Sequence, residues 1–239
     1  MDNEPLIDDP DPESAGVLVD LASSSPVTVV AFGGLTTGRE VARFEFFRFL
    51  SGLDVGRVFL RDHEQAWYQL GVRGVADTVD GIGAYLLELL GEDAMRRAVF
   101  TGGSMGAYVA MLLGSRLGVA EVQVFAPQTF ISRGLRRYYR DFRWQKQINH
   151  TWANIGDRHG YLDLKSPLRR SARGQAVPIH IHVGSEQRDL HHVQRIHRIP
   201  GVEIHRYAEI ATHNVAGELN DTGRLRAIFV AAVERAGSR

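Results

Sequence analysis

The chain alternates short apolar runs, rich in β-branched residues, with longer segments of helical periodicity. Strands are predicted at residues 27–32, 58–60, 97–101, 122–126, 177–183 and 202–207. Helices are predicted at residues 36–53, 79–90, 106–117, 190–197 and 223–236. Strands joined through helices form right-handed crossovers, and the helices then cover both faces of the sheet. We therefore expect an α/β protein, a three-layer α/β/α sandwich around a mostly parallel sheet.

The domain organisation follows from length and local composition. A chain of 239 residues with 44% apolar side chains suits one domain with a large core. Residues 1–14 are acidic and contain proline, so we expect a disordered leader before a single domain at 15–239. Residues 130–175 separate two predicted strands and are too long for a simple crossover. We expect them to form a cap insertion.

Composition also excludes several classes of partner and cofactor. The 28 basic residues balance 28 acidic ones, so we expect no nucleic-acid partner. The chain contains no cysteine, which excludes disulfides and thiolate chemistry and fits a reducing, cytoplasmic location. No apolar stretch is long enough to cross a bilayer, so we expect no stable membrane insertion. Its histidines lack any H-E-x-x-H spacing, and we expect neither a metal nor another cofactor.

The motif G-x-S-x-G occupies residues 102–106, between a predicted strand and a predicted helix. A serine hydroxyl becomes a good nucleophile when a base takes its proton and N–H donors receive the oxyanion. A sharp strand-to-helix turn lifts the hydroxyl above the sheet and aims the next backbone N–H into the site. We therefore predict Ser104 as the nucleophile and the N–H of Met105 as one oxyanion donor.

The remaining catalytic groups are predicted in loops that follow strands. The backbone N–H of Leu35 or of Gly34, after the first predicted strand, is expected to complete the oxyanion hole. His213 follows the last strand and suits a general base, because its pKa lies near neutrality. Asp189 and Glu186 both follow the preceding strand and both qualify as the acid. We prefer Asp189, whose shorter side chain holds the imidazole tautomer.

With Ser104, Asp189 and His213 in this order, the chain resembles the α/β-hydrolase superfamily over residues 26–236. The resemblance implies a compact form of the fold that lacks the first two strands and carries a cap after residues 122–126. The glycine loop departs from the pattern, since Phe32 stands where many members carry histidine. Residues 61–71 also resemble small bacterial hydrolase-like proteins encoded near polysaccharide genes.

Two further sets of residues are candidates for substrate binding. Asp62 and Trp67 follow the strand at 58–60, where open α/β sheets bind ligands. The alternative for this pair is a hydrogen-bonded loop carboxylate and a packed indole. Arg136, Arg137 and Arg140 lie in the expected cap and match an anionic group. Their alternative is a solvated amphipathic helix.

These residues together predict a serine hydrolase that cleaves a carboxylic ester, in a small molecule or a glycan, through an acyl-enzyme. An acyltransferase would use the same residues and exclude water from the acyl-enzyme. A non-catalytic, hydrolase-like scaffold in glycan assembly is the alternative from another class, because a fold does not guarantee an activity.

Overall fold

The computed structural model describes residues 15–36, 44–156 and 160–239, so the leader predicted at 1–14 lies outside the described residues. The described strands form a seven-stranded sheet in the order β1-β3-β2-β4-β5-β6-β7. Their bounds are β1 Val17–Asp20, β2 Thr28–Phe32, β3 Gly56–Leu60, β4 Val99–Gly103, β5 Glu121–Phe125, β6 Ile179–Val183 and β7 Val202–Arg206. β1 is antiparallel to β3, and all other neighbours are parallel. The mostly parallel α/β sheet is thus confirmed.

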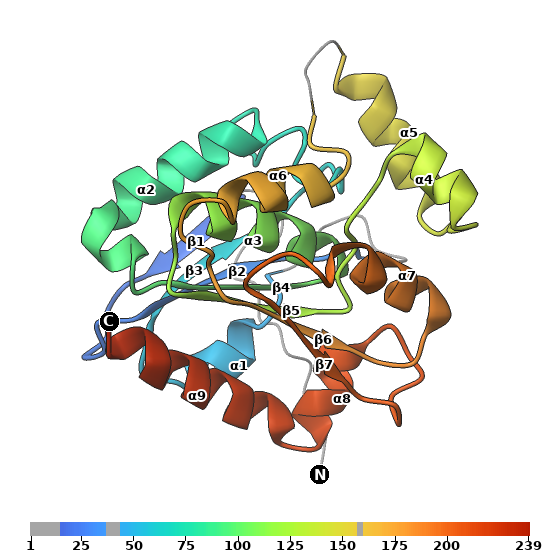
Figure 1. The fold of residues 1–239 in the computed structure, drawn as a ribbon. Helices are drawn as coiled ribbons and strands as arrows, with labels where there is room; N and C mark the ends of the chain where they lie inside the picture. The colour runs from blue at the N-terminus through green and yellow to red at the C-terminus, as the bar shows by residue number, and fades with distance from the viewer. Residues whose placement is uncertain (1–14, 37–43, 157–159) are drawn as a thin grey trace.

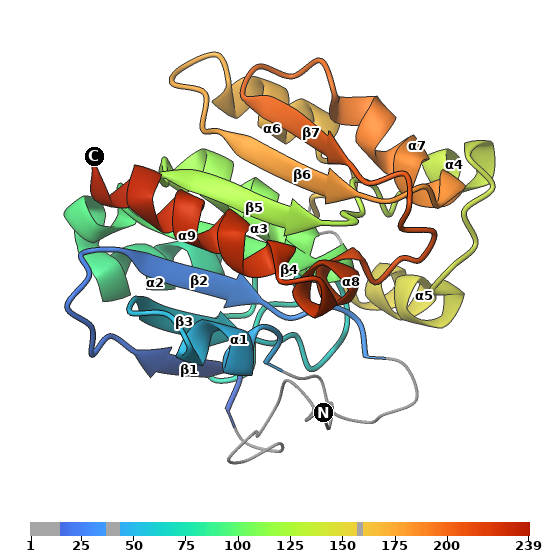
Figure 2. The same ribbon diagram turned by 90° about the horizontal axis from the view of Figure 1, so that it is seen from below.

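Helices lie on both sides of this sheet, which gives three layers (Figure 1). One layer contains α2 Val79–Met95, α3 Ser104–Leu117, α6 Lys165–Ser171 and α7 Gln187–Ile196. The other contains α1 Phe47–Ser51, α8 Val215–Asp221 and α9 Arg224–Gly237. Two more helices, α4 Arg133–Tyr138 and α5 Gln145–Asn154, project beyond the sheet edge (Figures 1 and 2).

The strand β2 illustrates how the sequence builds two cores. Val30 and Phe32 point into the cluster formed with α2 and α3, whereas Val29 and Ala31 point into the cluster with α8 and α9. Successive side chains of a strand face opposite sides, so a strand covered on both faces reads as one continuous apolar run. Burial of each large side chain contributes about 1.5–3 kcal/mol.

Strand β1 differs from the sequence prediction, which begins the sheet at residue 27. β1 pairs with β3, placing Val17 opposite Leu60, and forms the edge of the sheet. Because Val19 is 41% exposed, this four-residue strand gives no continuous buried signal. The chain therefore keeps an antiparallel edge strand that the compact form inferred from the sequence omits.

Two helices also differ from their predicted bounds, and a third has no counterpart in the sequence prediction. Of the helix predicted at 36–53, residues 37–43 lie outside the described part, and α1 begins only at Phe47. Gly91 kinks α2 with φ of 72° instead of ending it. The helix α8 was not predicted, and the side chain of Asn214 caps its first turn by accepting from the Gly217 N–H at 3.2 Å.

The predicted insertion divides into two parts. α4 and α5 lie at the end of the sheet where the parallel strands terminate (Figures 1 and 2). α6 instead packs against α3 within the helical layer. A β-bridge between Phe130 and Asp163 closes the excursion at its base. Among the described helices, none combines the length and apolar character that a bilayer crossing requires.

Candidate active site

Ser104 occupies a sharp turn between the end of β4 and the start of α3. Its φ of +50° lies in the left-handed region, which costs a non-glycine residue about 1–3 kcal/mol. The flanking glycines permit this turn. A Cβ on Gly106 would lie 2.0 Å from the carbonyl oxygen of Phe32, and one on Gly102 would lie 2.5 Å from the carbonyl carbon of Gly106. Both positions therefore require glycine.

A chain of hydrogen bonds runs from Ser104 through His213 to Asp189. The Ser104 Oγ lies 2.9 Å from His213 Nε2, and His213 Nδ1 lies 2.7 Å from Asp189 Oδ2. The three residues follow β4, β7 and β6, whose carboxyl ends meet at one edge of the sheet. Asp189 is 1% exposed and the His213 side chain 27% exposed. The predicted nucleophile, base and preferred acid are thus brought together.

Glu186, the alternative acid, has a different position at the N-cap of α7. Its Oε2 accepts from the backbone N–H of Asp189 at 3.0 Å, and its Oε1 accepts from Arg188 Nε at 2.7 Å. Such a cap fixes the first turn of a helix and contributes about 1 kcal/mol. Glu186 therefore holds the backbone that carries Asp189, and its own carboxylate does not contact His213.

Arg143 of the insertion is a site residue that the sequence analysis did not single out. Its Nη1 donates to Asp189 Oδ1 at 2.7 Å, and its Nη2 donates to Asp141 Oδ2 at 2.7 Å. Burial opposes ionisation of Asp189, but the hydrogen bond from His213 and the charges of His213 and Arg143 outweigh it and lower the Asp189 pKa. His192 of α7 contacts Asp141 on the other side at 3.1 Å. The insertion is therefore bound to the proposed acid through a buried ion pair.

The predicted oxyanion donors differ in their availability. Met105 is the second residue of α3, so its backbone N–H has no intrahelical acceptor. Leu35 lines the cavity beside Ser104. The backbone N–H of Gly34 donates to the carboxyl group of Glu45. Of the two candidates in the glycine loop, Leu35 is therefore the one whose N–H is not already engaged by that carboxyl group.

Glu45 is a second site residue that the sequence analysis missed. Its carboxyl group accepts from the backbone N–H groups of Gly34 and Gly103, and so links the glycine loop to the residue before Ser104. Burial raises the pKa of Glu45 to about 7, against the lowering effect of these two hydrogen bonds. The group therefore changes charge near neutral pH inside the cavity.

A cavity of about 450 Å³ opens beside Ser104 and His213. Its apolar wall is formed by Leu35, Phe46, Phe49, Phe125, Trp144, Val215 and Leu225. Trp144 comes from the insertion, and its ring centre lies 6.3 Å from that of His213. Its indole N–H is buried and has no partner among the described residues. A bound molecule with a hydrogen-bond acceptor at this position would give the N–H a partner.

Asp62 and Trp67 do not belong to this cavity wall. The carboxylate of Asp62 is buried and accepts from the N–H groups of Glu64, Ala66 and Tyr68 at 3.0, 2.7 and 2.8 Å. The indole of Trp67 is fully buried and donates to Gln128 Oε1 at 2.6 Å. Both side chains build the loop after β3, which corresponds to the structural alternative for this pair.

None of the three arginines proposed for substrate binding lines the cavity. Arg136 is 5% exposed, donates to Gln145 Oε1 at 3.1 Å and also donates to the carbonyl oxygen of Arg143. It therefore supports the insertion from within. Arg137 and Arg140 are exposed, and neither lines the cavity.

Comparisons with known proteins address the fold. No protein-family model matches the chain, and a search of curated proteins finds no match. Among solved structures, a capsule O-acetyltransferase of Neisseria meningitidis serogroup A is similar, with 14% identity, a TM-score of 0.68 and coverage of 92% of this chain and 91% of that one. A hormone-sensitive lipase from a metagenome library has 14% identity and a TM-score of 0.61, covering 94% of this chain and 86% of that one.

A third similar structure is the naproxen esterase of Bacillus subtilis. It has 16% identity and a TM-score of 0.52, and the match covers 90% of this chain and 86% of that one. At these identities the similarity concerns the fold. Together with the sheet order and the parallel strands, it shows that the chain has the α/β-hydrolase fold.

Proposed function

We propose that this α/β-hydrolase-fold chain is a serine enzyme that cleaves carboxylic esters through an acyl-enzyme on Ser104. The observation that carries the proposal is the hydrogen-bonded chain Ser104–His213–Asp189 at the mouth of an apolar cavity. Nucleophile, base and orienting acid in hydrogen-bond reach are the arrangement that activates a serine hydroxyl.

The residues act in a defined order. Ser104 Oγ attacks the acyl carbon while His213 Nε2 takes its proton. The N–H groups of Met105 and Leu35 stabilise the oxyanion, and His213 then protonates the leaving alcohol. Water, deprotonated by His213, attacks the acyl-enzyme and releases the carboxylic acid. Asp189 holds the Nδ1 proton throughout and stabilises the imidazolium.

The cavity wall favours a neutral acyl group. Phe46, Phe49 and Phe125 line the space together with the aliphatic side chains of Leu35, Val215 and Leu225, which suits a hydrocarbon or acetyl group. Glu45 adds a carboxyl group that carries a negative charge above a pH of about 7. An acyl chain that ends in a carboxylate would be repelled there, so we expect kcat/KM for such esters to fall as the pH rises through 7.

Acyl transfer is the second candidate, since it uses the same acyl-enzyme with an acceptor alcohol in place of water. Two observations favour it. Trp144 of the insertion lines the cavity with its ring centre 6.3 Å from that of His213, a position from which it would limit the access of water to an acyl-enzyme. The capsule O-acetyltransferase, one structure of which is a complex with CoA, is also similar over 91% of both chains in that structure.

Labelling with a fluorophosphonate probe tests the proposal directly. We expect one label on Ser104 and none in Ser104→Ala, whereas Ser132→Ala, at a cap position without a side-chain hydrogen bond, should label normally. Ser104→Ala should lower kcat on a p-nitrophenyl ester by at least ~10³-fold. A Ser104→Ala variant that keeps most of its activity would refute the mechanism, and an unlabelled wild type would favour a non-catalytic scaffold.

The fate of the acyl group separates the two activities. Wild-type protein is mixed with a radiolabelled acyl thioester and an excess of a glycan or simple sugar alcohol. Label in free carboxylate indicates hydrolysis, and label in the sugar indicates transfer. Ser104→Ala should abolish both products.

A further inference from the structure

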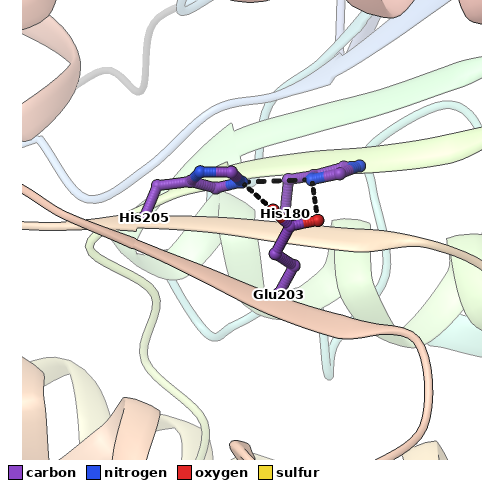
Figure 3. A group of neighbouring side chains, drawn as sticks. All are labelled: His180, Glu203 and His205. Atoms are coloured by element: carbon purple, nitrogen blue, oxygen red, sulfur yellow. Dashed lines mark hydrogen bonds and ion pairs between the residues drawn. The ribbon is translucent and has the colours of Figure 1, made fainter.

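Three potential metal ligands converge on the sheet face that carries α9, within the two outermost parallel strands. His180 of β6 lies opposite Glu203 of β7, and His205 follows two residues later on the same face of β7. Figure 3 shows the two imidazole rings directed toward each other, with the Glu203 carboxylate between them. α8 and α9 leave β6 and β7 open in the view of Figure 2.

The ligand atoms lie close together, since one atom from each of the three residues can be chosen so that all lie within 4.8 Å of one another. His180 Nδ1 lies 3.1 Å from His205 Nε2 and 3.4 Å from Glu203 Oε2, and His205 Nε2 lies 3.6 Å from Glu203 Oε1. Zinc bonds of 2.0–2.1 Å in a tetrahedron separate neighbouring ligand atoms by about 3.3–3.4 Å. The pairwise contacts have about this length, and the two imidazoles contact different oxygens of the Glu203 carboxylate.

Protonation alone satisfies this arrangement poorly. A neutral imidazole has a single N–H, so in a hydrogen bond between His180 Nδ1 and His205 Nε2 only one of these nitrogens carries a proton, and the carboxylate of Glu203 faces the lone pair of the other. A divalent cation would balance all three acceptors together. A metal binds imidazole in its neutral form and carboxylate in its ionised form, so the three side chains are of the types that such a cation takes as ligands.

The surroundings hold the His205 ring and leave room for a fourth ligand. The His205 ring stacks on His182, with ring centres 4.8 Å apart. His182 is itself fixed by Gln123 Oε1 at 2.8 Å and by the Tyr207 hydroxyl at 3.0 Å. Both of its nitrogens are thereby occupied, which explains why it is not a ligand. Glu203 is 62% exposed, so water can complete the coordination.

We propose that His180, Glu203 and His205 bind one zinc-type divalent cation that ties β6 to β7. The sequence analysis expects no metal because no single segment carries the spacing of a metal motif. Here two adjacent strands supply the ligands, and only their register brings the ligands together.

The position of the site indicates a structural role for the ion. His180 lies four residues before Gly184, where the loop after β6 begins, which places it about 13 Å along the strand from the end of the sheet where Ser104 lies. The strands it would join, however, lead into the loops that carry Asp189 and His213. Bound metal should therefore stabilise the fold without being consumed or required for bond making.

Calorimetric titration of Zn²⁺ into tag-free, chelator-treated protein tests the proposal. We expect one equivalent to bind with a micromolar or lower Kd, and to raise Tm. His205→Ala and Glu203→Gln should each weaken binding by at least ~10-fold, more for the histidine, since even outer partners of a metal contribute that much. His197→Ala, on the exposed end of α7, is the matched control and should bind normally.

Co²⁺ provides a second readout, which reports the coordination geometry of the bound ion in addition to its affinity. A tetrahedral site should give an intense visible absorption that disappears in His205→Ala and remains in His197→Ala. Glu203 is largely exposed, so Glu203→Gln should fold even if the histidine variant does not. Absence of binding below a Kd of about 1 mM would overturn the proposal, as would Zn²⁺ binding that neither variant reduces.

Discussion

Replacing Asp189 with asparagine gives the sharpest test of the proposed mechanism. The carboxylate accepts from two donors, His213 Nδ1 on Oδ2 and Arg143 Nη1 on Oδ1. An asparagine has one oxygen and one NH₂ group for these positions. Arg143 is a cation without acceptor capacity, so the amide oxygen must face it. The NH₂ group then faces His213 and requires an unprotonated Nδ1.

The tautomer that results is the wrong one for catalysis. With its proton on Nε2, His213 cannot take the proton of Ser104, although the heavy atoms have not moved. The same substitution in a serine protease lowers kcat by ~10⁴, which corresponds to about 5.5 kcal/mol of transition-state stabilisation. We expect a loss of this size in kcat, with KM little changed.

Glu186→Gln is the matched control, because its amide oxygen can still cap the Asp189 N–H. We expect kcat within ~3-fold of wild type and a stability loss below ~1 kcal/mol. The assay is kcat on a p-nitrophenyl ester at constant pH, with Tm measured on the same samples. An Asp189→Asn variant within 10-fold of wild type, or an equal loss in Glu186→Gln, would refute the assignment of the acid.

Three further changes have distinct expected outcomes. Gly106→Ala would place a Cβ 2.0 Å from a backbone oxygen of β2 and should destabilise the fold by about 3 kcal/mol or more, whereas Gly134→Ala, with nothing within 4 Å, should not; equal Tm values would contradict this. The folded-state pKa of Glu45, about 7, exceeds the ordinary value of 4.5, so wild type loses stability as the pH rises from 4.5 to 7 and the carboxyl group ionises. The stability of Glu45→Gln relative to wild type should therefore increase over this range by up to about 3 kcal/mol, and a pH-independent Tm difference would contradict this. If Arg137 and Arg140 bind an anionic substrate group, their joint change to glutamine should raise KM for a carboxylated ester and spare a neutral one; equal effects on both esters would count against this role.

The fold was predictable because it depends on local signals. Buried parallel strands such as β2 and β5 are continuous apolar runs, and Gly118 ends α3 in the left-handed conformation where the sequence places the end of a helix. β1 escaped prediction because a half-exposed edge strand of four residues has no such run. The full extent of α2 was not predicted from the sequence, because a glycine such as Gly91 can kink a helix as well as end it.

The residues of the candidate site could be predicted only where their position after a strand indicates their place in the fold. Ser104, Asp189 and His213 were identified because each follows a strand, and the carboxyl ends of parallel strands meet at one edge. Arg143 reaches the candidate site from 46 residues before Asp189, and Glu45 reaches it from a loop before β3. No rule of sequence spacing links either residue to the site. Asp62 follows a strand too, yet its carboxylate turns back onto its own loop.

The ion pair between Arg143 and Asp189 also limits how the molecule can admit and release ligands. If α4 and α5 swung away, Arg143 and Asp141 would move together with them, and Asp189 would lose this counter-charge while remaining in α7. Leaving a buried charge without its partner costs about 3–5 kcal/mol. If Asp189 acts as the proposed acid, opening of the insertion would therefore disturb the carboxylate that orients His213 at the same time as it exposes the cavity to solvent.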